Sequence, residues 1–163
     1  METIIQAASQ LPAIQFYFVG GREADLRRLG LRDKITANVH FAGKLDFTEM
    51  PLWHTAADVL LVTGTKNDDY SYHYTSPMKL FEYMAAKRPI VASRTPAIAQ
   101  VVLDNEVFFH QPDNPHNLEM VIASVFNQPD QARRRAEQAY HKAEELSWDK
   151  RAERVLAFIR QRL

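Results

Sequence analysis

Short apolar segments, most of which end in glycine or serine, alternate along this sequence with segments of helical periodicity. The apolar segments cover residues 14–21, 38–43, 57–64, 89–93 and 106–110. Residues 14–21 and 57–64 have the composition of buried strands, residues 38–43 alternate at Val39 and Phe41, and residues 89–93 and 106–110 are expected to form the last two strands. Strands that alternate with helices are joined by crossover connections. The pattern therefore predicts an α/β fold, a Rossmann-like three-layer domain with a mostly parallel sheet and helices on both faces.

Helices are expected between these strands, where apolar residues recur three to four positions apart. Asp46 and Ser76 precede two of them as N-caps, and Pro77 suits the first helical position because its missing N–H would have no partner there. Pro129 and the Ser147–Trp148 junction separate the last three helices. The expected helices cover residues 4–11, 22–30, 47–56, 76–88, 95–102, 117–126, 131–146 and 148–163. Residues 66–75 show no periodicity and are expected to form a loop.

Composition excludes several classes of protein. The chain has 163 residues without a repeat or a linker, which predicts one domain over residues 1–163. Its 20 Lys and Arg balance 20 Asp and Glu, so binding to nucleic acid by bulk phosphate neutralisation is not expected. The absence of cysteine excludes disulfides, thiolate catalysis and Cys-ligated zinc, and the six histidines show no metal-ligand spacing. With no signal peptide and no membrane span in the sequence, a cytoplasmic location is expected.

Ligands of open parallel sheets bind beyond the carboxyl ends of the strands. The turns at these ends contain Gly20 and Gly21, Gly43 and Lys44, residues 64–75, and residues 93–96. The full Gly-x-Gly-x-x-Gly fingerprint, the phosphate loop and the nucleophile elbow are all missing from the sequence. A dehydrogenase is therefore not expected.

The helix that starts near Ser76 is a candidate anion site. Free N–H groups and the positive end of the helix dipole favour an anion there, and a bound phosphate would compensate the charge of Lys79 in the first turn. The alternative interpretation is a helix cap with a lysine whose stem lies along the surface.

Glu82 lies one turn further along and could accept two hydrogen bonds from a vicinal diol such as a ribose. It could equally be a solvated carboxylate that interacts favourably with the helix dipole. The segment before this helix could stack on a sugar or a base, or could be a plain surface loop. Its acidic and aromatic residues are Asp68, Asp69, Tyr70, Tyr72, His73 and Tyr74.

The segment SPMKLFEYMAAKRPIVAS, residues 76–93, resembles the signature stretch of family 4 (group 1) retaining glycosyltransferases of the GT-B fold. FYFVGG resembles the second strand of the family's C-terminal domain, and residues 38–64 resemble its third strand, helix and fourth strand. Such enzymes have two Rossmann-like domains, and the C-terminal one binds the nucleotide-sugar donor. The resemblance implies a donor-binding domain of a hexosyltransferase, which uses a nucleoside diphosphate sugar as substrate and needs no metal or other cofactor.

The resemblance also implies roles for single residues. Glu82 matches the second carboxylate of the family's Glu-x-x-x-x-x-x-x-Glu motif, which holds the donor ribose. The main-chain N–H groups around Ser76, Met78 and Lys79 match the segment that faces the diphosphate. Gly43 and Lys44 match the stretch beside the base. Pro77, Gly20 and Gly21 complete the donor-binding candidates, and the catalytic residue stays unknown.

The sequence departs from the family at two positions and in length. Tyr74 stands where the first motif carboxylate is expected, and Gln100 replaces a usual glutamate. Neither the N-terminal acceptor domain nor the first strand of the donor domain, which is central in the family's strand order, is present. The chain is therefore expected to be either a fragment of a longer enzyme or a form in which a rearranged or shared strand fills the gap. An unfilled gap would leave two sheet edges unpaired, so self-association is expected. The chain on its own is expected to transfer no sugar.

Other functions stay open. The chain could be a non-catalytic module that binds a nucleotide sugar or a partner protein, or half of a nucleotide-sugar epimerase. The partners expected for the donor-domain interpretation are a nucleotide sugar and the missing N-terminal domain. Peripheral membrane contact would come through the full enzyme, and no nucleic acid is expected.

Overall fold

Short parallel strands lie between two layers of helices. The structure, a computed structural model, describes residues 1–20, 30 and 32–162. Every strand in this part of the chain lies within a segment where the sequence predicts one. The strands are β1 (Phe16–Val19), β2 (Val39–Gly43), β3 (Leu60–Val62), β4 (Ile90–Ser93) and β5 (Phe108–His110). The predicted α/β class is confirmed.

The strands form two separate sheets. β1 pairs with β2, and β4 lies between β3 and β5, with every pairing parallel. Phe16 is in register with Val39, and Leu60 with Ile90. Within the described ranges no strand pairs with both β1 and β3, so each of them has a single strand neighbour. The gap between the two sheets lies at the position where the resemblance places a further, central strand.

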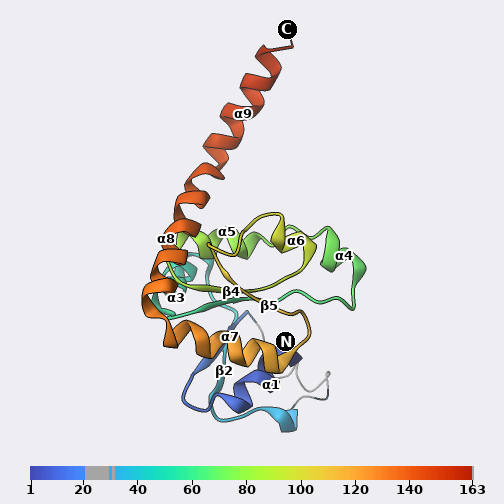
Figure 1. The fold of residues 1–163 in the computed structure, drawn as a ribbon, viewed down its shortest axis with the longest axis vertical. Coiled ribbons are helices and arrows are strands. Elements are labelled where there is room, and N and C mark those ends of the chain that lie inside the picture. The colour runs from blue at the N-terminus through green and yellow to red at the C-terminus, as the bar shows by residue number, and fades with distance from the viewer. Residues whose placement is uncertain (21–29, 31, 163) are drawn as a thin grey trace.

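Helices cover the strands on both faces (Figure 1). They are α1 (Glu2–Gln10), α3 (Met50–Ala56), α4 (Asp69–His73), α5 (Met78–Ala85), α6 (Pro96–Ala99), α7 (Pro115–Asn127), α8 (Pro129–Glu145) and α9 (Trp148–Arg160). Short 3-10 turns cover Arg32–Lys34 and Phe47–Glu49. The helix expected over residues 22–30 falls mostly outside the described ranges. Every other expected helix is present, although most ends differ by one or more residues.

The hydrophobic core has two halves, one on each face of β4. Val91 points into a cluster with residues of α1 and α7, including Ile4 and Leu118. Ile90 and Ala92 point to the other face, where they pack with residues of α5, α6 and α8. This alternation is the two-residue period of a strand, and burial on both faces explains why the segment is continuously apolar.

Side-chain hydrogen bonds fix several element ends. Asp46 accepts from the Thr48 N–H at 2.9 Å, and Glu49 accepts from the Asp46 N–H at 3.1 Å, so the predicted cap is confirmed as a capping box. Buried Asn38 donates from Nδ2 to three main-chain carbonyls at the end of α1 and in the segment that follows it. These carbonyls belong to Ala8, Leu11 and Ile14, at 3.1, 3.0 and 2.8 Å.

The segment expected as a loop, residues 66–75, contains the short helix α4, so this expectation is wrong. Asp68 caps α4 by accepting from the Ser71 N–H at 2.8 Å. Asp69 and His73, four positions apart, pair across one turn at 3.0 Å. Local polar contacts stabilise this turn, and an apolar-periodicity criterion cannot detect them.

The last helix, α9, extends away from the two layers (Figure 1), and its whole length is exposed. None of the helices in the described residues is both long enough and apolar enough to cross a membrane.

Candidate functional site

The start of α5 is free of side-chain caps. The helix begins at Met78, and Pro77 takes the N-cap position in an extended conformation, with φ −75° and ψ 97°. The predicted role of Ser76 as the cap is therefore wrong, because Pro77, which was expected as the first helical residue, is extended and takes the N-cap position itself. A proline side chain has no acceptor, so the first N–H groups of α5 are not capped by it.

Burial on one side of α5 fixes its orientation. Leu80 and Met84 are fully buried in the core half that includes β4. Met78, Lys79 and Glu82 lie on the opposite, exposed face, because positions three and four apart share one side of a helix. Two of the candidate donor-binding side chains, Lys79 and Glu82, thus share one surface near the helix start.

Glu82 precedes Tyr83, a half-buried residue whose ring packs against the buried ring of His54. His54 of α3 meets Tyr83 edge to face, with ring centroids 4.9 Å apart. Burial lowers the pKa of His54, and the Glu82 charge raises it in part. Burial raises the pKa of Tyr83, and the Glu82 charge adds to that rise. The carboxylate is therefore close to the contact between α3 and α5 although its own side chain is exposed.

Lys79 and Asp113, which lies in the segment after β5, both carry charges that act on the α-amino group of Met1, the N-cap residue of α1. Burial lowers the pKa of the Met1 α-amino group, the charges of Asp113 and Glu2 raise it, and the Lys79 charge lowers it again. These charges therefore act on one amino group, at the residue that precedes α1.

Tyr74 is 69% exposed and follows α4 directly. Its ring centroid is 6.1 Å from that of Tyr70 and 5.8 Å from that of His73. The aromatic residues of this segment thus form a surface group whose rings are accessible to a ligand.

The glycine turns lie at the ends of β1 and β2. Gly20 donates its N–H to Gly43 O at 2.7 Å, and both have positive φ values, 87° and 70°, that favour glycine. Lys44 is exposed beside them. Gly21 lies outside the described residues. Within the described part of the chain, no hydrogen bond links Gly20, Gly43 or Lys44 to residues 76–82.

Ser93, His110 and Asp113 form a polar group at the carboxyl ends of β4 and β5 that the motifs do not reveal. Ser93 and His110 are buried, with Ser93 Oγ 3.0 Å from His110 Nε2. His110 Nδ1 lies 2.8 Å from Gln111 O, which can only accept, so Nδ1 carries a proton. In the neutral ring Nε2 is an acceptor for the Ser93 hydroxyl, which also lies 3.2 Å from Gly64 O. Burial lowers the pKa of His110, which favours this neutral form.

Two of these residues, Ser93 and Asp113, also contact the loop that leads from β3 to α5. Gly64 donates its N–H to Ser93 Oγ at 2.9 Å. Asp113 Oδ2 accepts from the Lys66 N–H at 2.8 Å and from Thr65 Oγ1 at 3.1 Å. The only sequence signal for this group is that Ser93 and His110 end predicted strands.

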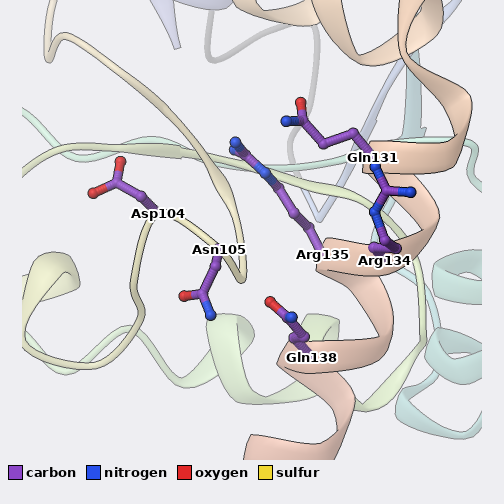
Figure 2. A pocket seen from close by; sticks show the side chains of 6 residues that line it. All are labelled: Asp104, Asn105, Gln131, Arg134, Arg135 and Gln138. Atoms are coloured by element: carbon purple, nitrogen blue, oxygen red, sulfur yellow. The ribbon is translucent and has the colours of Figure 1, made fainter.

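A shallow pocket of about 340 Å³ lies between α8 and the segment before β5. Figure 2 shows the residues that line it, which are Asp104, Asn105, Gln131, Arg134, Arg135 and Gln138. Asp104 and Asn105 precede β5, so the pocket is at the amino end of that strand, whereas the sequence-predicted candidates follow strand carboxyl ends. Asp104 pairs with Arg94, and Arg135 donates to Val107 O at 2.8 Å. The charged side chains Asp104 and Arg135 at this pocket therefore already have partners within the protein.

No cluster of three or more His, Asp or Glu side chains suited to a metal ion occurs among the described residues.

Comparisons with known proteins agree with the resemblance. A sequence model of the family described as glycosyl transferases group 1 matches residues 1–128. The phosphatidyl-myo-inositol mannosyltransferase of Mycobacterium tuberculosis is 27% identical over 119 residues, which are 73% of this chain and 30% of that protein.

Two solved structures share the fold. Sucrose-phosphate synthase from Thermosynechococcus elongatus superposes with a TM-score of 0.80 at 24% identity, over 98% of this chain and 41% of that one. HepE from Anabaena, in complex with UDP-glucose, superposes with a TM-score of 0.73 at 18% identity, over 89% of this chain and 40% of that one. The chain thus spans less than half the length of these proteins. At these identities the likeness shows the fold, a Rossmann-like domain of GT-B glycosyltransferases.

Proposed function

Since this chain belongs to the glycosyl transferases of group 1, we propose that it is the donor-binding C-terminal domain of a retaining glycosyltransferase. It would bind a nucleoside diphosphate sugar. The longer enzyme, with an N-terminal acceptor domain, would move the sugar, a hexose or a close relative, to an acceptor. The observation that carries the proposal is the uncapped start of α5, with Lys79 and Glu82 on its exposed face.

The electrostatics of α5 suit a diphosphate. The N–H groups of Met78 and Lys79 and the positive end of the helix dipole favour an anion, and Lys79 adds a full charge. Negative charge grows on the diphosphate as the bond to the sugar breaks, so positive groups fixed in advance stabilise the transition state more than the ground state. The proposed reaction uses the donor as a substrate and no further cofactor.

Glu82 suits the ribose of the same donor. Its carboxylate lies one turn beyond Lys79 and can accept hydrogen bonds from both hydroxyls of a vicinal diol. Gly20, Gly43 and Lys44 follow β1 and β2, and we assign them to the base. The UDP-glucose in the HepE structure supports a nucleotide sugar as the ligand of this fold, and the mannosyltransferase relative supports a hexose.

A binding module without transferase activity is the second candidate function. Tyr74, which is 69% exposed, favours it, because a tyrosine stands where the resemblance places a carboxylate that addresses the donor sugar. A phenol cannot provide that negative charge at neutral pH.

Calorimetric titration of the 163-residue chain with UDP, GDP and ADP tests donor binding. We expect one of the three to bind, and binding of none would contradict both candidate functions. A radiolabelled-donor assay with lipid and glycan acceptors then separates the donor domain from a complete enzyme. We expect no transfer by this chain, because acceptor orientation needs the second wall of the cleft. Robust transfer would contradict the assignment to one domain of a longer enzyme.

A further inference from the structure

The loop that joins β3 to α5 is attached at its beginning to residues of two other strands. Its residues 64, 65 and 66 each contact Ser93 or Asp113, through the Gly64 N–H, the Thr65 hydroxyl and the Lys66 N–H. Asn67 extends this set, because its N–H donates to Thr65 Oγ1 at 3.1 Å. Four successive residues are therefore fixed before the chain reaches α4.

Close packing adds to these hydrogen bonds. A Cβ atom on Gly64 would lie 3.0 Å from Thr95 Cγ2, so the main chain at Gly64 lies directly against Thr95. Thr95 has little freedom to move, because it is buried and caps α6 by accepting from the Ile98 N–H at 3.3 Å. The beginning of the loop is thus held by packing on one side and by Ser93 on the other.

Asp113 adopts a backbone conformation that is unfavourable for most residues. Its φ is 55°, in the left-handed region, which Asp tolerates better than most side chains. Such a conformation persists where the surroundings fix it, and at Asp113 it accompanies two hydrogen bonds to the loop.

We propose that Ser93, His110 and Asp113, together called the loop anchor, hold residues 64–77 in the conformation that receives the donor diphosphate at the start of α5. Ser93 and Asp113 contact the loop, and His110 acts through Ser93 by accepting a hydrogen bond from its hydroxyl. All three are positioning residues. A loop that is ordered before binding loses less entropy when the ligand arrives, which increases affinity. The inference rests on the proposed function for its ligand, and its structural part can be tested without one.

Two substitutions at one position isolate the Asp113 carboxylate. Asp113→Gly removes the side-chain acceptor, and glycine adopts the left-handed backbone conformation without strain. Asp113→Asn replaces the carboxylate by an amide whose oxygen can still accept, and asparagine also tolerates this φ. Hydrogen exchange measured by mass spectrometry on the ligand-free chain should show residues 63–77 exchanging about tenfold faster in Asp113→Gly, since an opening equilibrium shifts tenfold for each 1.4 kcal/mol. Asp113→Asn should stay within about twofold of the parent. Exchange in α7 should be unchanged in both.

Titration with UDP, GDP and ADP supplies the functional readout. For the nucleotide that binds the parent, Asp113→Gly should weaken binding about tenfold and Asp113→Asn about twofold or less. The free nucleoside should lose less affinity, because the anchored loop faces the diphosphate. Ser93→Ala, which removes the partner of Gly64, should repeat the effect of Asp113→Gly on both measurements.

The outcomes separate the anchor from the proposed function. Unchanged exchange in Asp113→Gly, or faster exchange along the whole chain, would overturn the anchor. Faster loop exchange with unchanged nucleotide affinity would overturn its role toward the donor. A parent chain that binds none of the three nucleotides would overturn the proposed function and the donor role together, while exchange still decides whether the anchor holds the loop.

Discussion

Replacement of Glu82 by glutamine tests the ribose assignment with little effect on folding. The substitution keeps the size of the side chain and removes its charge. Glu82 is exposed, so the free energy of unfolding should change by less than about 0.5 kcal/mol. Hydrogen bonds to a charged group are worth about 1.5–3 kcal/mol. Nucleoside diphosphate binding should therefore weaken roughly 10- to 150-fold.

The assay is calorimetric titration of the parent and of two variants. Glu145→Gln removes an exposed carboxylate from α8 and should bind like the parent. A second readout checks the position of Glu82 without a ligand. Because the Glu82 charge raises the pKa of His54, the pKa of His54 followed by NMR should fall in Glu82→Gln. Parent-like affinity in Glu82→Gln would refute the ribose assignment, and an unchanged His54 pKa would refute the geometry on which it rests.

Three further predictions concern folding and association. Asn38→Ala removes a buried donor from three carbonyls and should lower the free energy of unfolding by about 2–3 kcal/mol in urea titrations; a loss below about 0.5 kcal/mol would contradict the described contacts. Burial holds the pKa of His110 below its usual 6.5, so the unfolded chain binds a proton more readily. The part of the stability that depends on His110 should be constant above about pH 7.5 and should fall as the pH drops below about 6.5. His110→Gln should reduce this fall, and equal profiles would contradict the burial of His110. The Phe16 N–H donates to Asn38 O, so the Tyr17 N–H points to the open edge of β1. The parent should self-associate in sedimentation velocity, and Tyr17→Pro should reduce this more than Tyr17→Ala; a strictly monomeric parent would show that the free edges do not pair.

Local sequence patterns predicted most elements of the fold. Short segments rich in apolar residues identified all strands of the described residues, most directly β4, whose four residues are all buried. β1 and β2 keep partly exposed positions, and residues 38–43 were predicted from the alternation of Val39 and Phe41. The Asp46 cap was also predictable, because its hydrogen-bond partners lie within three residues of it in the sequence. Helix α4 was not, because polar contacts alone define it. The start of α5 was misplaced because Pro77 was expected inside the helix.

Contacts between distant segments were beyond the reach of these patterns. Asp113 and Lys66 are 47 positions apart, and Ser93 and His110 are 17 apart. Their proximity depends on the order in which the strands pair and on the positive φ of Asp113, neither of which leaves a periodic trace. The donor-binding residues came from residue types and from the resemblance, and their roles stay predictions.

Amide chemical-shift mapping tests the central claim most directly. The ¹⁵N-labelled 163-residue chain would be titrated with whichever of UDP, GDP and ADP binds in calorimetry. We predict that the largest shifts occur at the Met78 and Lys79 amides, with smaller ones at Glu82. Shifts confined to the pocket around Arg134 and Arg135, or spread over the chain without a maximum at the start of α5, would contradict the account.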